Sequence, residues 1–249
     1  MRQSNLYVIL FAVGITVVFG GALSLTSVGL KPLQDKQVEI DTKKKILGAV
    51  MDISNITNPN EILRVYKEKV NSMVVDIDGN QIEKDEKGNP IVAEKINIQK
   101  NSKLDAENRM YPVFMFSESG SNIDAYIFPT FGSGLWDWIS SYVALESDLN
   151  TVKGIAFDHK SETPGLGARI TEAKIQQRFV GKEIYNDQGE LESITMVKGE
   201  GNTGLSEHQV DGMSGATMTA KGVNAMLESY LECYQAFIEK TKSQKTASL

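Results

Sequence analysis

The sequence predicts an α+β protein in which one N-terminal transmembrane helix precedes a domain built on a largely antiparallel sheet. Three observations support this fold class. Residues 3–30 contain no charged side chain, strand-like apolar runs follow one another in the middle of the chain, and an amphipathic helical pattern occupies residues 216–240. Strands in succession with helices at the ends are typical of α+β folds, whereas strands that alternate with helices indicate a parallel sheet.

The first predicted element is the uncharged, predominantly apolar segment at residues 6–30. About 20 such residues span the hydrocarbon core of a bilayer, so this segment is long enough to cross a membrane once. The alternative is a cleaved signal peptide, because Ala22-Leu23-Ser24 loosely resembles a small-residue cleavage site. The apolar run exceeds the roughly 15 residues of a signal peptide, and we therefore expect a retained anchor over residues 1–30.

A membrane-proximal α/β segment is expected over residues 31–110. Residues 38–53 place apolar side chains on one side and lysines on the other, which predicts a helix that continues or follows the anchor. Asparagine, proline and asparagine at positions 58–60 predict the start of a second helix, which runs to residue 69. Extended segments are expected at residues 73–77 and 91–98.

Residues 111–249 are expected to form the second domain, a sheet followed by a C-terminal helix. Strand-like runs lie at residues 113–116, 123–128, 138–145 and 152–157. A helical stretch is expected at residues 170–179, and the sequence NDQG predicts a hairpin between residues 184–185 and 194–198. Apolar side chains then recur at three- and four-residue steps over residues 216–240, which predicts an amphipathic helix.

Composition excludes two kinds of site. The chain has 26 basic and 32 acidic residues, a formal net charge of -6 and no basic stripe interleaved with aromatic residues, so no nucleic-acid partner is expected. The single cysteine, Cys233, cannot form an internal disulfide. Its two histidines, His159 and His208, are too few and too far from Cys233 to form a zinc site, so we expect no metal centre.

The stretch DGMSGATMT at residues 211–219 places hydroxyls and small residues directly before the C-terminal helical pattern. The first N–H groups of a helix lack intrahelical partners and the helix dipole adds positive charge there, so this position favours an anion such as a phosphate. Gly215 and Ala216 leave room for a large group near the backbone. The alternative is that Ser214 or Thr217 only caps the helix.

The string DGMSGAT resembles the flavinylation motif of a covalent-FMN family. That family includes the NqrC subunits of the Na+-translocating NADH:quinone oxidoreductases and their close relatives in the Rnf electron-transport complexes. The resemblance implies that a flavin transferase attaches FMN to Thr217 through a phosphodiester. It also implies that the transferase recognises Asp211 and that Ser214, Gly215 and Ala216 form the recognition loop.

Two further strings support the same resemblance. SETPGLG, within residues 159–169, is similar to the flavin-pocket loop of these subunits, and GLW, within residues 132–145, is similar to another of their segments. The residues that the resemblance places in the flavin pocket are Glu162, Thr163, Leu166, Gly167 and Trp136. The alternatives are an ordinary Pro-Gly turn for the first string and core packing for the second, and we expect Trp138 in the core.

The resemblance implies an electron-transfer subunit of the Na+-translocating NADH:quinone oxidoreductase. Its cofactor would be covalent FMN, and the NADH and quinone sites would lie on other membrane subunits of the pump. A flavin transferase would be its partner during maturation. The alternatives are the related flavin-carrying subunit of an Rnf complex, a flavin-tethered reductase outside any pump, and a membrane-anchored binding module without a redox role.

The expected location is the bacterial inner membrane, with one membrane span and the folded domain on the periplasmic or outer face. Lysines at positions 31, 36 and 43–45 follow the span, and the positive-inside rule would place the domain in the cytoplasm. Large domains cross the membrane with little regard to charge, and the family resemblance implies the outer face. We therefore expect the outer face.

Overall fold

The computed structural model describes residues 4–85, 87–120 and 122–247. The chain divides into two compact units, the first ending at Thr42 and the second beginning at Lys43. Helix α1 (Asn5–Gly48) has 44 residues, and within the described part of the chain it alone is long and apolar enough to cross a membrane. The predicted helix at residues 38–53 is thus a continuation of the apolar helix, and it ends at Gly48.

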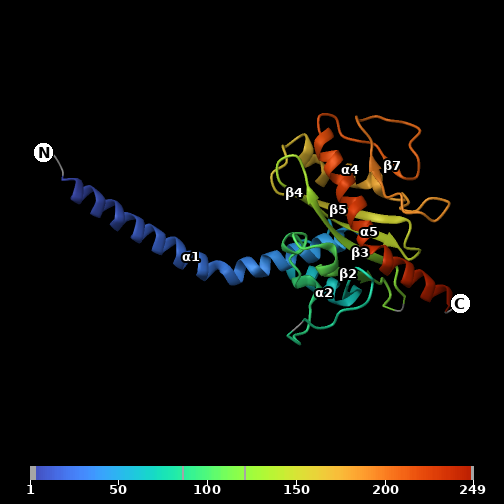
Figure 1. Cartoon of the computed structure of the whole chain (residues 1–249), viewed down its shortest axis with the longest axis horizontal. Helices are drawn as coiled ribbons and strands as arrows, with labels where there is room; N and C mark the ends of the chain where they lie inside the picture. Colours follow the sequence, from blue (N-terminus) through green and yellow to red (C-terminus); the bar gives the residue numbers. More distant parts are fainter. Residues whose placement is uncertain (1–3, 86, 121, 248–249) are drawn as a thin grey trace. The chain divides into compact units, whose positions relative to one another are not determined.

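The second unit is built on one five-stranded sheet whose strands are neighbours in chain order (Figure 1). Each strand pairs antiparallel with the next, which confirms the predicted fold class. The strands are β1 (Val70–Val75), β2 (Tyr111–Phe116), β3 (Ala125–Ser133), β4 (Trp138–Glu146) and β5 (Val152–His159). All four strands predicted in the second domain are present, and the largest shift of an end is at β3, which runs to Ser133 rather than to residue 128.

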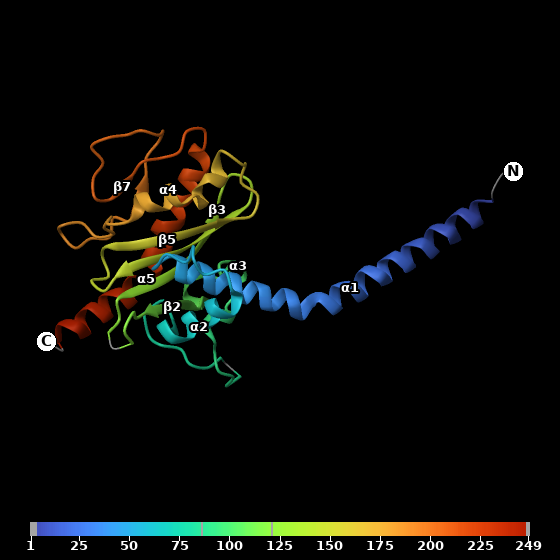
Figure 2. The ribbon, with the colours of Figure 1, turned by 180° about the vertical axis from the view of Figure 1, so that it is seen from behind.

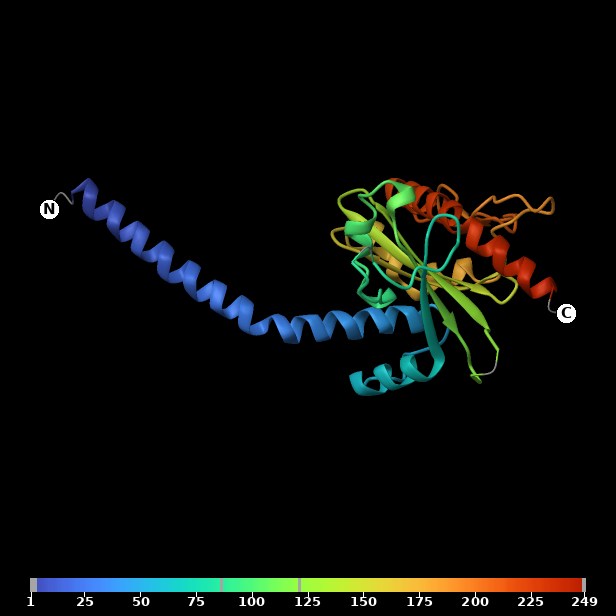
Figure 3. The same cartoon turned by 60° about the horizontal axis from the view of Figure 1, so that its bottom comes forward.

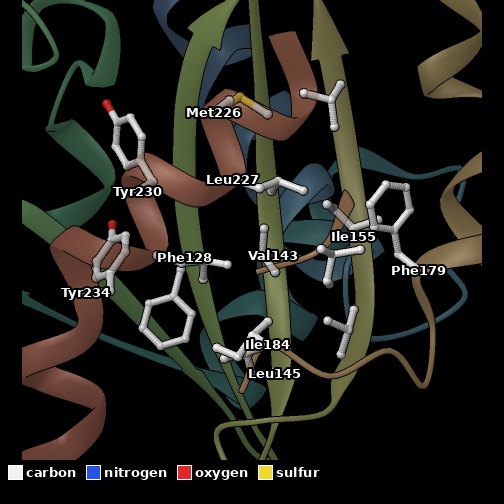
Figure 4. Close-up of a cluster of buried hydrophobic side chains, with 14 of the residues drawn as sticks. Phe128, Val143, Leu145, Ile155, Phe179, Ile184, Met226, Leu227, Tyr230 and Tyr234 are labelled. Atoms are coloured by element: carbon white, nitrogen blue, oxygen red, sulfur yellow. The ribbon is translucent and has the colours of Figure 1, made fainter. Parts of the chain in front are cut away.

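The sheet is buried on both faces, because alternate residues of its strands enter two separate hydrophobic clusters. On β2, Val113 belongs to one cluster and Phe114 to the other. Helix α5 (Thr217–Ala247) lies along one face and α2 (Pro59–Lys69) along the other, as Figure 3 shows with the strands between them. Figure 4 shows Leu227 of α5 near Val143 of the sheet.

Short elements connect these layers (Figure 2). They are η1 (Ala93–Lys95), α3 (Ile98–Asn101), η2 (Ala106–Asn108), η3 (Gly167–Thr171), α4 (Ala173–Gln176), η4 (Gln177–Phe179), β6 (Thr195–Met196) and β7 (Gln209–Val210). The predicted helix at residues 170–179 is therefore three short pieces. Helix α2 begins as predicted, because the Asn58 side chain accepts a hydrogen bond from Asn60 N–H at 2.9 Å.

Two predicted elements are wrong. Residues 91–98 form no strand, because the preceding turn closes on itself through a bridge between Lys84 and Pro90 and the chain then enters η1. The hairpin at NDQG is limited to a single bridge between Tyr185 and Leu191. The apolar run at 194–198 instead supplies β6, which pairs in parallel with β7. In both cases the apolar pattern indicated an extended segment but could not identify its partner.

Candidate functional site

Three loops that are far apart in the sequence meet at the N-terminus of α5. The first is the turn between β3 and β4, which is closed by a hydrogen bond of 2.8 Å from Gly134 N–H to Asp137 O. The second follows β5, and the third leads into α5. Around them lies a cavity of about 190 Å³. Its lining residues are Leu135, Glu162, Thr163, Leu166, Gly167, Gly215, Ala216, Thr217, Met218 and Thr219.

The side chain of Glu162 connects all three loops. Its residue is only 4% exposed, and its Oε1 accepts hydrogen bonds from the backbone N–H groups of Leu135 at 2.8 Å and Trp136 at 3.0 Å. Its Oε2 accepts a hydrogen bond of 2.5 Å from the Thr219 hydroxyl in the first turn of α5. Both oxygens of this buried group are therefore satisfied, and the Trp136 turn is tied to the start of the helix.

Glycines make room for this carboxylate. A Cβ atom on Gly134 or on Gly167 would overlap the oxygen atoms of Glu162, and at Gly167 it would also overlap the Thr219 hydroxyl. Gly215 has a φ of +75°, in the left-handed region that favours glycine, and a Cβ there would lie 2.8 Å from Cδ2 of Leu166. The small residues of the two predicted strings therefore bring backbone and carboxylate into close contact.

Thr217 is the first residue of α5, and its half-buried side chain lines the cavity. Neither its hydroxyl nor that of Ser214 has a hydrogen-bond partner among the described residues. The capping alternative considered from the sequence therefore has no hydrogen bond to support it. The N–H groups of the first turn and the positive end of the helix dipole lie at the same place.

Asp211 and Arg178 hold the loop before Thr217 in place. The Asp211 carboxylate accepts hydrogen bonds from the backbone N–H groups of Gly201 at 2.8 Å and Asn202 at 2.9 Å. Burial acts to raise the pKa of Asp211, but these hydrogen bonds outweigh it and keep the pKa below its ordinary value. Arg178 donates to the backbone oxygens of Asp211 and Gly212, so the loop is supported from both sides.

Glu200 joins this support to the loop of the predicted flavin pocket. It pairs with Arg169 at 2.7 Å and with Arg178 at 2.8 Å, and it accepts a hydrogen bond of 3.4 Å from Ser214 N–H. Hydrogen bonds from Arg169, and then from Arg178, hold the pKa of Glu200 well below its usual range. Asp211 and Ser214 therefore support the cavity from outside its lining.

Large apolar side chains surround the cavity and remain exposed. The exposed fraction is 67% for Trp136, 54% for Met218, 50% for Leu135 and 41% for Leu166. The indole Nε1 of Trp136 donates a hydrogen bond of 3.1 Å to Thr163 Oγ1, so the ring is anchored at the rim. The alternative that Trp136 is a core residue is wrong. Trp138, expected in the core, is half-buried with its ring 6.0 Å from that of Phe131.

Sequence reasoning missed three residues of the cavity, namely Leu135, Met218 and Thr219. Leu135 and Met218 adjoin Trp136 and Thr217, so their position next to predicted site residues was the available signal. For Thr219, the signal was its place two residues after the acceptor, since the first turn of a helix brings both side chains to its N-terminal end.

The cavity fits an FMN group. A phosphate on the Thr217 oxygen would lie at the start of α5, where anions are stabilised. The exposed apolar side chains of Trp136, Leu166 and Met218 offer surfaces for a flat aromatic ring, and clustered exposed apolar residues of this kind mark binding sites in many proteins. Gly167 and Gly215 expose backbone on which such a ring could lie.

Comparison with known proteins agrees with this geometry. The model of the FMN-binding domain family matches residues 134–232. The NqrC subunit of the Na+-translocating NADH-quinone reductase from Neisseria meningitidis serogroup A is 30% identical, over 96% of this chain and 95% of the relative. The same subunit from Haemophilus ducreyi is 32% identical, over 78% of this chain and 77% of the relative.

Solved structures show the same relationship. The crystal structure of the corresponding Na+-translocating NADH-quinone reductase subunit from Parabacteroides distasonis superposes with a TM-score of 0.70 and 32% identity, and the match covers 84% of this chain and 96% of that one. NqrC of Shewanella oneidensis, at 24% identity and a TM-score of 0.70, shares the fold. By sequence and by fold, the chain belongs to the NqrC family of Na+-translocating NADH-quinone reductase subunits.

Proposed function

We propose that this chain is the FMN-carrying electron-transfer subunit of a Na+-translocating NADH-quinone reductase, with FMN joined to Thr217 through a phosphodiester. The observation that carries the proposal is the Thr217 hydroxyl, which lines the cavity at the start of α5 and has no hydrogen-bond partner among the described residues. Bound FMN supplies the redox chemistry, and the NADH and quinone sites lie on other subunits.

The residues of the cavity then have distinct tasks. The first turn of α5 stabilises the phosphate through its N–H groups and dipole. Trp136 and Leu166 cover the apolar ring, and the hydrogen bond from Trp136 to Thr163 keeps the indole at the rim. Glu162 holds the Trp136 turn and α5 at a fixed separation, so the ring and the phosphate are positioned together.

Maturation requires a flavin transferase in this proposal, and the loop at residues 211–216 is the segment that it would bind. Ser214 and Gly215 are exposed, whereas Asp211 is held by Gly201 and Asn202. Asp211 therefore presents the loop in one conformation, and the transferase reads that conformation together with the side chains beside Thr217.

The proposed organisation is a membrane anchor at residues 1–30, a membrane-proximal segment at 31–110 and the FMN-binding domain at 111–249. The strand β1 joins the sheet of that domain from the membrane-proximal segment. We place the folded domain on the periplasmic face of the inner membrane, beside the other subunits of the pump. Protease added to intact spheroplasts should digest it, and complete protection would contradict this placement.

The acceptor is tested by mass spectrometry of the full chain coexpressed with its flavin transferase. We expect the peptide that contains Thr217 to carry the added mass of FMN, and the gel band to fluoresce after denaturation. The Thr217→Ala variant should lose both signals. Thr203→Ala is a matched control, because Thr203 is an exposed threonine of a nearby loop and should leave both signals intact.

Two results would contradict the proposal in different ways. Persistence of the FMN mass in Thr217→Ala would mean that another residue is the acceptor. A wild-type chain without flavin, prepared from membranes together with its transferase, would favour a membrane-anchored binding module instead. Copurification with other membrane subunits separates the pump from a flavin-tethered reductase that acts alone.

A further inference from the structure

We infer that the Glu162 carboxylate, which lies in the cavity wall without a cationic partner, lowers the redox potential of the flavin on Thr217. The inference rests on the proposed function and assigns a second role to a residue that also connects the loops of the site. Three features of the structure carry it: the burial of the carboxylate, the absence of a cation that pairs with it among the described residues, and the glycines that fix its position.

Burial is nearly complete, because Glu162 is 4% exposed although it lines the cavity. Its hydrogen-bond donors are two backbone N–H groups, from Leu135 and Trp136, and the hydroxyl of Thr219. These donors are neutral, so they stabilise the carboxylate without cancelling its charge. A group bound in the cavity therefore lies beside a negative charge that little water screens.

The nearby cations are occupied elsewhere. Lys160, two residues before Glu162, pairs with Asp137 at 2.8 Å, and Arg169 pairs with Glu200 at 2.7 Å. In the part of the chain that the structure describes, no lysine, arginine or histidine forms an ion pair with Glu162. Buried charges in proteins are usually paired, so an unpaired carboxylate at a ligand cavity is a candidate for a functional role.

The position of the charge is fixed by backbone. Gly134 and Gly167 lie against the two carboxylate oxygens, so closely that a Cβ atom at either residue would overlap them. The side chain therefore has no room to turn away from the cavity when the charge of a bound group changes. An electron that enters a flavin adds negative charge to the ring, and a fixed carboxylate beside the ring opposes that step.

The test is a redox titration of the full-length, flavin-loaded chain in detergent, with Glu162→Gln as the first variant. Glutamine keeps the size of the side chain, its oxygen can accept both N–H groups, and its amide can donate to the Thr219 oxygen. We expect reduction to become more favourable by about tenfold in the equilibrium constant, which is ~59 mV for one electron. The titration reads the flavin potential and needs no turnover.

Thr219→Val is the matched variant, because valine has the shape of threonine and leaves the charge of Glu162 in place. It removes one donor to the carboxylate, so the flavin potential should stay the same or fall. A general loosening of the site would move both variants in the same direction, whereas the charge moves them apart. If Glu162→Gln fails to fold, a potential that rises in Thr219→Val still contradicts the inference.

Failure of the inference is distinct from failure of the proposed function. Fluorescence of the wild-type band in a denaturing gel establishes that the flavin is attached before any titration begins. A loaded Glu162→Gln chain whose potential equals that of the wild type overturns the role of Glu162 and leaves the acceptor unaffected. A wild-type chain without covalent flavin overturns the proposed function itself.

Discussion

The two halves of α5 are held against the same sheet by different kinds of contact. In the C-terminal half, Leu231, Tyr234 and Ile238 are completely buried among apolar side chains (Figure 4). In the first turns, the helix approaches the sheet through glycine and a few polar atoms, namely Gly222 against Ser133 and Thr219 against Glu162.

This difference separates the part of α5 that stabilises the fold from the part that positions the site. Burial of a large apolar side chain contributes about 1.5–3 kcal/mol, whereas a single hydrogen bond contributes a net of about 0.5–1.5 kcal/mol. We therefore expect substitutions in the C-terminal half to lower the free energy of unfolding most strongly. Substitutions near Thr217 should change the site while costing less stability.

The largest effect is expected for Tyr234→Ala. Tyr234 is completely buried, its hydroxyl donates to Pro112 O at 3.0 Å and to Pro129 O at 3.2 Å, and its ring lies 4.8 Å from that of Phe128. Loss of this side chain should lower the free energy of unfolding by about 3–5 kcal/mol in urea titration. Tyr234→Phe should cost only about 1–2 kcal/mol, because it removes the hydrogen bonds and keeps the ring. Equal costs for the two variants would contradict this assignment.

The next effect is expected where the helix first approaches the sheet, in Gly222→Ala. Alanine is the better helix former by about 1 kcal/mol, but a Cβ at residue 222 would overlap the Ser133 oxygen and lie 3.3 Å from the Cα of Gly134. We expect a net loss of about 1–3 kcal/mol and weaker flavin loading, because the Trp136 turn must shift. Lys221→Ala, at an exposed neighbouring position, should change neither. A Gly222→Ala chain as stable as the wild type would show that the close approach is dispensable.

The same contrast determines what could be predicted from the sequence. The long helices and the four central strands follow from local periodicity, since apolar residues at steps of three and four or of two indicate which face is buried. The C-terminal helix was predicted over residues 216–240 and is observed at Thr217–Ala247. These elements depend on many residues, so small errors at their ends leave the prediction intact.

The site depends on single contacts between distant segments, and periodicity carries no information about them. Glu162 and Thr219 are 57 residues apart, and their contact requires the close approach of Gly134 and Gly167. Thr219 could not be predicted for this reason, because its role depends on a neighbour that spacing cannot supply. The candidate residues Glu162, Thr163, Leu166 and Gly167 came from family resemblance, and the structure places them around one cavity with Thr217.

A smaller effect, visible in the pH dependence of stability, is expected from Glu200→Gln. Hydrogen bonds from Arg169 and Arg178 lower the pKa of Glu200 below its ordinary value of 4.5, so its contribution to stability is present above pH 4.5 and is lost as the pH falls toward the lowered pKa. The variant should be less stable than the wild type at neutral pH, and the two should converge in acid. Urea titrations between about pH 3 and pH 7 test this, and parallel curves over that range would contradict it.

The smallest effect on stability is expected for Trp136→Phe, although this change reports most directly on the site. Trp136 is 67% exposed and has one side-chain hydrogen bond, to Thr163, so the free energy of unfolding should change by less than about 0.5 kcal/mol. The chain has two tryptophans, and Trp138 is half-buried beyond the lining of the cavity. If the flavin on Thr217 lies against Trp136, it should quench much of the tryptophan fluorescence of the wild type. The fluorescence gained when Thr217→Ala removes the flavin should then shrink in a Trp136→Phe background. An undiminished gain would place the ring on another side of the cavity and would restrict the role of the N-terminal half of α5 to holding the phosphate.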